Sequence, residues 1–181
     1  MRKLFLDLET YSEVPIKNGT YRYAENAEIL LLAYALDDEP AKLWDLTEAL
    51  SPPTDLLDAW TRDDYVVLAH NGGLFDRIVL HHDPILPRIP ASRWLDTQVQ
   101  ARSHGLPSSL ANLCAAFRLP EDQAKLKDGR QLVLTFCAPV RGVRILPQDK
   151  PEAWARFGEY AMRDVDSMRA VHNLMPVWNY P

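Results

Sequence analysis

Two acidic residues two positions apart, Asp7 and Glu9, are the first residues whose types and spacing point to chemistry. They follow a short apolar run at residues 4–6, which is typical of a buried strand. Because side chains two apart in a strand point to the same face, both carboxylates should lie together. Two like charges near a core are unfavourable unless a cation offsets them, and a divalent metal with oxygen ligands suits that role. The alternative is a strand end at which both acids reach solvent, or at which one caps a helix.

A third acid, Asp76, follows a second apolar run at residues 65–69 and the sequence His-Asn-Gly-Gly-Leu-Phe. Paired glycines at a strand end permit the close approach of a ligand or of another backbone. Asp76 should fall in the first turn of the next helix. An acid is favoured there by the helix dipole alone, so helix-end charge is the alternative to a role in a site.

A tyrosine and an acid four residues apart, Tyr160 and Asp164, lie in the last helical segment. This spacing places both on one face of that helix, a turn apart. Asp166 is two residues further on and points elsewhere. The alternatives are an amphipathic aromatic residue for Tyr160 and a solvated helix charge for Asp164.

Apolar runs and turn signals predict the elements that must position these residues. Strands are predicted at residues 4–6, 28–36, 41–44, 65–69 and 92–95. Helices are predicted at residues 46–60 (interrupted by two prolines), 74–82, 96–103, 110–117, 130–137 and 151–175. Asp96 is expected to cap the helix that follows it, with support of a site as the alternative. A hairpin layer followed by strand–helix units predicts an α/β fold with a mixed central sheet flanked by helices, and residues 1–181 are expected to form a single domain.

The composition is that of an ordinary globular protein. The chain has 181 residues, of which 47% are hydrophobic and 25% charged. No apolar stretch approaches the length of a membrane span, and the start of the chain is unlike a signal peptide, so a soluble, cytoplasmic protein without a membrane partner is expected. Cys114 and Cys137 lack a metal-type spacing and resemble small core residues. The net charge of −5 argues against broad electrostatic adhesion to nucleic acid, but not against an enzyme that holds a few nucleotides through metal ions.

Together these acids resemble the motifs of the DEDD exonuclease superfamily, which has an RNase H-like fold. The matching pieces are residues 7–10, 71–76 and 160–164. A tyrosine four residues before the last acid marks the tyrosine-bearing subclass. Residues 21–25, 95–97, 106–110 and 127–129 are in addition similar to the proofreading domain of phage-type family A DNA polymerases. The similarity covers nearly the whole chain.

The resemblance implies a metal-dependent 3′–5′ exonuclease and a role for each acid. Asp7 would bridge two Mg²⁺ or Mn²⁺ ions. Glu9 and Asp164 would complete the metal on the nucleophile side, and Asp76 would reach the second metal through water. Tyr160 would orient the attacking water as a hydrogen-bonding group, because an unperturbed phenol pKa near 10 makes it a poor base. The product would be a nucleoside monophosphate from a single-stranded DNA 3′ end, as in proofreading during DNA replication.

The nucleic-acid-binding candidates are Leu8, Thr10, Asn71, Phe75, Lys125, Lys127 and Arg130. Backbone groups of Leu8 and Thr10 are expected to contact the terminal nucleotide. Phe75 is expected to stack on a base, with core packing as the alternative. Asn71 lies five residues before Asp76 where the family usually has four, which leaves its substrate contact open.

The two lysines and the arginine of that set form the most basic stretch of the chain. They are expected to hold backbone phosphates, with a solvated loop as the alternative. The chain stops at Pro181 where such polymerases continue. It is therefore expected to work beside a polymerase body or partner subunit, or as a free-standing exonuclease.

Two other functions remain open. One is an exoribonuclease that trims RNA 3′ ends on the same fold, since contact with the 2′-hydroxyl depends on local geometry. The other is a catalytically silent scaffold domain, against which the presence of all four acids and the tyrosine argues.

Overall fold

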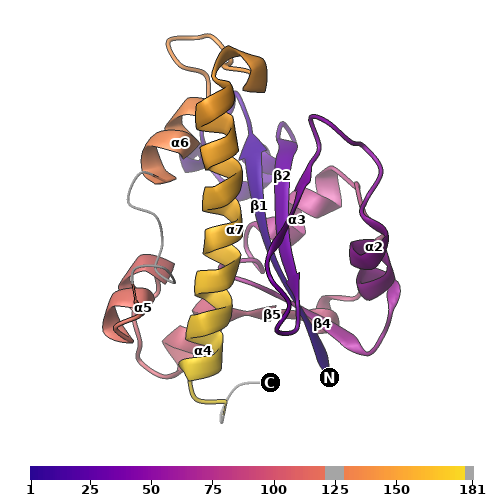
Figure 1. The fold of residues 1–181 in the computed structure, drawn as a ribbon, viewed down its shortest axis with the longest axis vertical. Coiled ribbons are helices and arrows are strands. Elements are labelled where there is room, and N and C mark those ends of the chain that lie inside the picture. The colour runs from indigo at the N-terminus through magenta and orange to yellow at the C-terminus, as the bar shows by residue number, and fades with distance from the viewer. Residues whose placement is uncertain (121–128, 178–181) are drawn as a thin grey trace.

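A five-stranded mixed sheet forms the centre of the molecule (Figure 1). The computed structural model describes residues 1–120 and 129–177. The strands, in the spatial order β3-β2-β1-β4-β5, are β1 (Arg2–Tyr11), β2 (Glu28–Leu36), β3 (Lys42–Asp45), β4 (Tyr65–Ala69) and β5 (Trp94–Asp96). β1 pairs antiparallel with β2 and parallel with β4, so it is the central strand. The predicted α/β architecture with a mixed sheet is confirmed.

Helices cover both faces of the sheet. They are α1 (Thr20–Ala24), α2 (Thr54–Thr61), α3 (Asp76–His82), α4 (Thr97–Ser103), α5 (Leu110–Ala116), α6 (Gly129–Phe136) and α7 (Pro151–Leu174). The long helix α7 runs across one face with α4, α5 and α6 beside it, and α2 and α3 lie on the other side (Figure 1). Among the described residues no helix is long and apolar enough to cross a bilayer.

Alternation along β1 sends its side chains into two separate hydrophobic clusters. Leu4, Leu6 and Leu8 pack in the cluster beneath α2 and α3. Phe5 and Tyr11 pack in the cluster beneath α7. Asp7 and Glu9 fall between Phe5 and Tyr11 in this alternation, so β1 presents them on the α7 face, as the strand pattern predicts.

One predicted helix is wrong over its first half. The sequence predicts an interrupted helix over residues 46–60, but α2 begins only at Thr54. The backbone N–H and the hydroxyl of Thr47 both donate to the Asp45 carboxylate, so the chain turns there. Pro53 then holds extended backbone, with φ −54° and ψ 137°. Two consecutive prolines disfavour helical backbone in the residue before each, which delays the helix.

Smaller differences occur at two other places. The polar stretch before β2, for which no element is predicted, contains the short helix α1. Leu74 and Phe75, predicted to begin the helix after β4, instead precede α3, which begins at Asp76. The acid of the second motif is therefore the first residue of its helix.

Candidate active site

The site lies where β4 ends beside β1. β4 pairs with β1 only as far as Phe5 opposite Leu68, whereas β2 follows β1 to Tyr11. The second half of β1 therefore has a neighbouring strand on one side only. Asp76 occupies the vacated side, since its Oδ1 accepts a hydrogen bond from the backbone N–H of Leu8 at 3.2 Å. This contact joins the acid of α3 to the strand that carries the first two acids.

The carboxylate of Asp96 fixes the turn that delivers Asp76. It accepts hydrogen bonds from the backbone N–H of Asn71 at 3.0 Å and of Gly73 at 3.1 Å. It also accepts from Gln98 at 2.8 Å and so caps α4, as expected. One side chain thus holds a helix end and the loop between β4 and α3.

The same turn explains the additional residue in the second motif. Asn71 adopts a left-handed conformation with φ 67°, which an Asn tolerates better than most residues. A Cβ on Gly72 would lie 2.3 Å from the Cβ of Ala69, so the backbone approaches the strand end too closely for any side chain. The turn therefore needs its first glycine for a close approach.

Helix α7 supplies Tyr160 and Asp164, both buried, with 5% of their surface exposed. Burial raises the pKa of the Tyr160 phenol far above its ordinary value, and the charges of Asp164, Glu9 and Asp7 raise it further. Three carboxylates from two distant parts of the chain therefore act on one hydroxyl group. That hydroxyl stays protonated at neutral pH and is a hydrogen-bonding group, not a base.

Three of the four acids are buried. Glu9 is 7% exposed, Asp76 3% and Asp164 5%, whereas Asp7 is partly exposed. Burial raises the pKa of Asp76 to about 7, and the charge of Asp96 acts in the same direction. Hydrogen bonds from its own backbone N–H and from that of Leu8 oppose the shift. Near neutral pH a nearby cation would favour the ionised form of Asp76.

The donor set fits hard divalent cations. Within residues 1–120 and 129–177, no three His, Cys, Asp or Glu side chains form a group that could hold a metal ion by themselves. Mg²⁺ keeps several waters and shares phosphate oxygens with its substrate, so it is usually bound by one or two carboxylates and not by a closed protein cage. Carboxylates that converge on one phenol from a strand and a helix meet this requirement.

Gly129, the first residue of α6, packs directly against the Tyr160 ring. A Cβ on Gly129 would lie 2.0 Å from Cε2 of Tyr160, so any side chain would displace the ring or the helix. Tyr160 also stacks on Phe157, with ring centroids 6.2 Å apart. From the sequence, Gly129 belongs to residues 127–129, one of the stretches similar to a polymerase proofreading domain, and no role is predicted for it.

Cys137 is the second residue near the acids that the sequence did not single out. Its thiol donates to Oε2 of Glu9 at 3.7 Å, and its backbone carbonyl accepts from the N–H of Ser12. Burial and the charge of Glu9 raise the pKa of the thiol, so it is an uncharged donor. It was expected to be a small core residue. No local pattern could reveal the contact, because 128 positions separate the two residues.

The residues expected to contact nucleic acid are mostly engaged within the protein. The N–H of Leu8 is bonded to Asp76. The Thr10 hydroxyl lies 2.8 Å from the Tyr23 hydroxyl, which in turn donates to the carbonyl of Thr10. Phe75 packs against the cluster beneath α2 and α3 and against the Tyr23 ring at 5.7 Å, which is the core packing given as its alternative.

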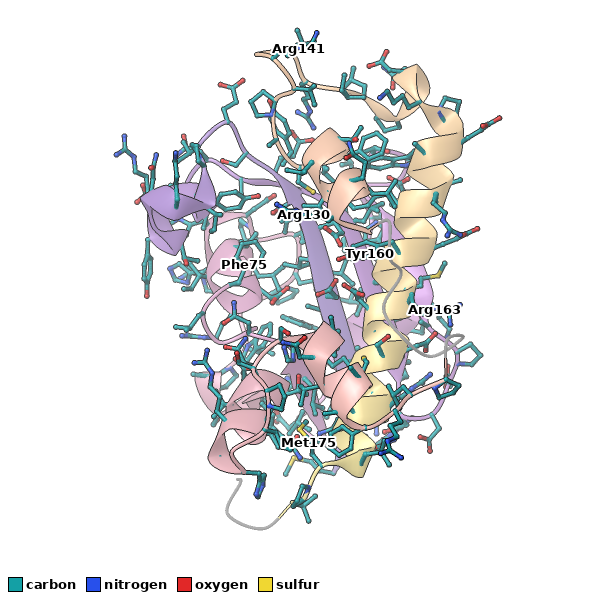
Figure 2. All side chains as sticks on the ribbon, turned by 90° about the vertical axis from the view of Figure 1, so that its left-hand side faces the viewer. Phe75, Arg130, Arg141, Tyr160, Arg163 and Met175 are labelled. Carbon is teal, nitrogen blue, oxygen red and sulfur yellow. The ribbon has the colours of Figure 1, made fainter. Side chains whose placement is uncertain are left out.

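Of the basic candidates, Arg130 lies at the start of α6. Arg130 is exposed, and Figure 2 shows it above the region between Phe75 and Tyr160, which lie on opposite sides of β1. Lys125 and Lys127 fall outside the residues that the structure describes.

No family model matches the chain. The chain is 37% identical over 183 residues to a DNA polymerase of Bacillus phage SP02, a match that covers 96% of this chain and 28% of the polymerase. It thus spans about a quarter of the length of this curated relative.

Solved structures share the fold at low sequence identity. NrnC from Brucella melitensis superposes with a TM-score of 0.59 at 15% identity, over 95% of this chain and 71% of NrnC. The family B DNA polymerase of Pyrobaculum calidifontis gives 0.58 at 14% identity, over 96% of this chain and 24% of the polymerase. The curated relative and the structural neighbours agree with the resemblance to the DEDD exonuclease superfamily. The shared fold is the RNase H-like architecture that the sequence predicts.

Proposed function

We propose that this domain is a metal-dependent 3′–5′ exonuclease of the tyrosine-bearing DEDD subclass that acts on single-stranded DNA beside a DNA polymerase. The observation that carries the proposal is that the charges of Asp7, Glu9 and Asp164 all act on the phenol of Tyr160. Asp76 joins them through its hydrogen bond to Leu8, next to both acids of β1.

Asp7, Glu9, Asp76 and Asp164 are the residues that would hold two divalent cations. One solved structure of Brucella melitensis NrnC contains Mg²⁺, and Mg²⁺ or Mn²⁺ suits these oxygen ligands. When bound, such ions lower the pKa of a water nucleophile and stabilise charge on phosphate oxygens.

The protein's own residues position the reactants. Hydrolysis adds water across the terminal P–O3′ bond: the water oxygen stays on the released 5′-monophosphate, and the 3′ oxygen of the shortened strand gains a proton. Tyr160 stays protonated, so it holds the attacking water in place and does not deprotonate it. Phe157 and Gly129 enclose its ring and fix that position.

The phage polymerase relative supports a role in proofreading. At 37% identity the match covers nearly all of this chain, and the matched part is about a quarter of a DNA polymerase. An exonuclease of this size beside a polymerase would receive 3′ ends directly from the site of synthesis.

A 5′-labelled oligonucleotide assay tests the proposal. Incubation of single-stranded DNA with the protein and Mg²⁺ or Mn²⁺ should give a ladder of progressively shorter labelled strands. Immediate release of a labelled mononucleotide would show the opposite direction. Asp164→Ala should abolish the ladder.

A matched RNA strand separates the DNA exonuclease from an RNA-trimming enzyme. Faster shortening of RNA than of DNA would reassign the substrate. If neither strand is shortened and Asp164→Ala changes nothing, the domain is a scaffold.

A further inference from the structure

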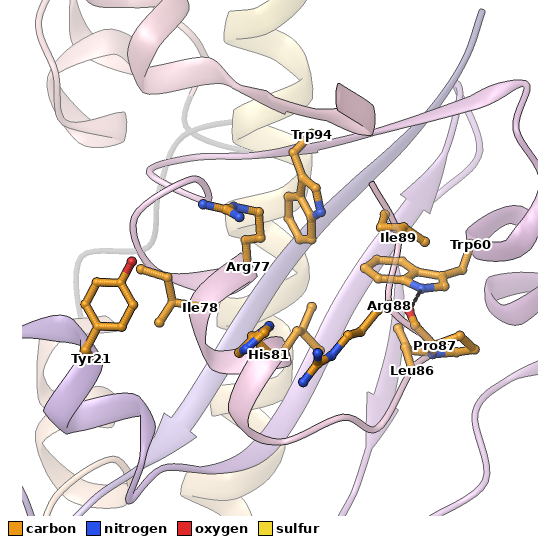
Figure 3. Close-up of a pocket in the computed structure, with 11 residues that line it drawn as sticks. Tyr21, Trp60, Arg77, Ile78, His81, Leu86, Pro87, Arg88, Ile89 and Trp94 are labelled. Atoms are coloured by element: carbon orange, nitrogen blue, oxygen red, sulfur yellow. Dashed lines mark hydrogen bonds between the residues drawn. The ribbon is translucent and has the colours of Figure 1, made fainter. Parts of the chain in front are cut away.

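A second concave site lies on the other face of the sheet, between α3 and the segment that leads to β5 (Figure 3). The cavity has a volume of about 230 Å³. Arg77 and His81 of α3 line it together with Arg88, and no acid is among its lining residues. Asp and Glu outnumber Lys and Arg in the chain by 25 to 20, so a lining with two arginines and no carboxylate is a local departure. We call this site the arginine–tryptophan pocket.

Aromatic rings form the walls of the arginine–tryptophan pocket. Tyr21 is 66% exposed at one end of the pocket in Figure 3, and Trp60 and Trp94 lie toward the other. The indole N–H of Trp60 donates to the carbonyl of Pro87 at 2.6 Å, and its ring meets that of Trp94 edge to face at 5.8 Å. The tryptophans are therefore held in fixed positions, while the tyrosine ring is open to solvent.

The two arginines are available to a ligand. Arg77 and Arg88 are both exposed, and in the described part of the chain neither forms an ion pair. Buried Arg93 shows the contrast, since its guanidinium donates to the carbonyls of Tyr65 and Trp60 and has a structural role.

Guanidinium groups beside an exposed aromatic ring, here that of Tyr21, are a combination that suits single-stranded nucleic acid. Arginine pairs with phosphate, and aromatic rings stack on bases of any sequence. Tryptophan, tyrosine and arginine are also enriched at the centres of protein interfaces. The chain has a net charge of −5, yet no carboxylate lines the pocket. This favours an anionic ligand over a protein surface.

The arginine–tryptophan pocket adjoins the carboxylate site through α3. Asp76 and Arg77 are consecutive residues, and the first points to β1 while the second lines the pocket. We propose that the pocket binds nucleotides of a single strand upstream of the 3′ end that enters the carboxylate site. In naming that 3′ end, this inference rests on the proposed exonuclease function.

Fluorescence anisotropy with labelled oligothymidylates tests the pocket without any need for cleavage. Binding is measured in EDTA with strands of about 3 and about 12 nucleotides. The double variant Arg77→Ala/Arg88→Ala should bind the long strand about 5- to 20-fold more weakly and bind the short strand with nearly unchanged affinity. The negative slope of log affinity against log salt should become shallower by about 1.4, because each lost phosphate contact to a single strand removes about 0.7 from its magnitude.

Arg102→Ala is the matched control, since Arg102 is an exposed arginine of α4 that does not line the pocket. It should bind both strands as the wild type does. Arg88→Glu alone, at an exposed loop residue, repeats the test if the double variant does not fold. Equal affinity of wild type and pocket variants for the long strand would overturn the proposal and leave the pocket to a protein partner. Failure of the wild type to bind either strand would overturn it as well.

The two proposals fail separately. Loss of long-strand binding in the pocket variants supports the pocket even if no strand is ever shortened. Shortening of DNA with pocket variants that bind like the wild type supports the exonuclease and rejects the pocket.

Discussion

The two halves of β1 have different neighbours and different side chains. Leu4 and Phe5 lie between β2 and β4, Leu6 follows them, and all three are at most 1% exposed. Asp7 and Glu9 lie beyond the last pair with β4 and share the face of Phe5. A strand that loses one neighbour halfway along its length gains an open edge while its first half stays anchored in the core. The carboxylates therefore owe their rigidity to the half of the strand that has no chemistry.

The largest expected effect is the difference between substitutions in the two halves of β1. Asp7→Ala should reduce exonuclease activity by about three decades or more, because the residue would hold both metal ions. The melting temperature without metal should change by no more than about 3 °C. Leu6→Ala should instead lower the free energy of unfolding by about 2–5 kcal/mol, since Leu6 is fully buried, and leave activity per folded molecule within about threefold. Steady-state kinetics and thermal melts of both variants check this, and an active but strongly destabilised Asp7→Ala protein would contradict it.

Gly129→Ala should have the next largest effect on turnover. Its Cβ cannot fit beside the Tyr160 ring, so the phenol must move. We expect kcat to fall by roughly 10- to 100-fold with KM nearly unchanged. Adding Gly129→Ala to Tyr160→Phe should cost little more than Tyr160→Phe alone, because both act through one hydroxyl.

Gly158→Ala is the control for that steric effect. Gly158 lies in α7, the helix that carries Tyr160, but on its β3 side and away from the tyrosine. A Cβ on Gly158 would lie 2.7 Å from Cδ2 of Leu43. Gly158→Ala should change the free energy of unfolding and leave kcat unchanged. Equal kcat values for Gly129→Ala and the wild type would show that turnover does not depend on the position of the Tyr160 ring.

Stability should depend on pH with opposite signs at Asp76, which contacts Leu8 in the second half of β1, and His172, which contacts Phe5 in the first half. Burial raises the pKa of Asp76 to about 7, so the stability gained from its protonated form is complete below about pH 4 and is lost as the pH rises through 7. Burial lowers the pKa of His172, which lies against Phe5, to about 4. The stability gained from its neutral form is complete above pH 6.5 and is lost as the pH falls through 4.

Urea unfolding in EDTA between about pH 4 and 8 measures both slopes. Relative to wild type, Asp76→Asn should become more stable as the pH rises across this range. His172→Gln should become more stable as the pH falls. Parallel curves for wild type and either variant would show that the residue titrates alike in the folded and unfolded chains.

The smallest effect is expected at Cys137. Its thiol is a weak hydrogen-bond donor to Glu9, so Cys137→Ala should change kcat/KM by no more than about threefold. Cys137→Ser keeps a donor at the same place and serves as the comparison. A loss of a hundredfold or more in the alanine variant alone would mean that the thiol positions the carboxylate.

Much of the fold can be predicted from local pattern. Buried apolar runs bounded by turn residues gave residues 28–36 and 65–69 as strands, and β2 and β4 have those bounds. Pro151 marks the start of α7, because its missing N–H costs nothing in the first turn. The helix predicted over residues 46–60 is wrong in its first half, because two prolines and the Asp45 side chain decide the backbone there.

The site is predictable only in part. The four acids and Tyr160 follow from residue type, spacing and the resemblance, and their catalytic roles stay predictions. The packing of Gly129 on Tyr160 and the bond from Cys137 to Glu9 depend on contacts between distant segments, which no local pattern contains. The arginine–tryptophan pocket likewise needs α1, α3 and the segment before β5 to meet in space.

The most direct test of the central claim is anomalous diffraction from crystals grown with Mn²⁺ and a nucleoside monophosphate. We expect manganese bound to the Asp7 carboxylate and to at least one of Glu9 and Asp164, with the nucleotide phosphate against the metal. Ordered nucleotide with manganese elsewhere, or with none beside Asp7, would contradict it.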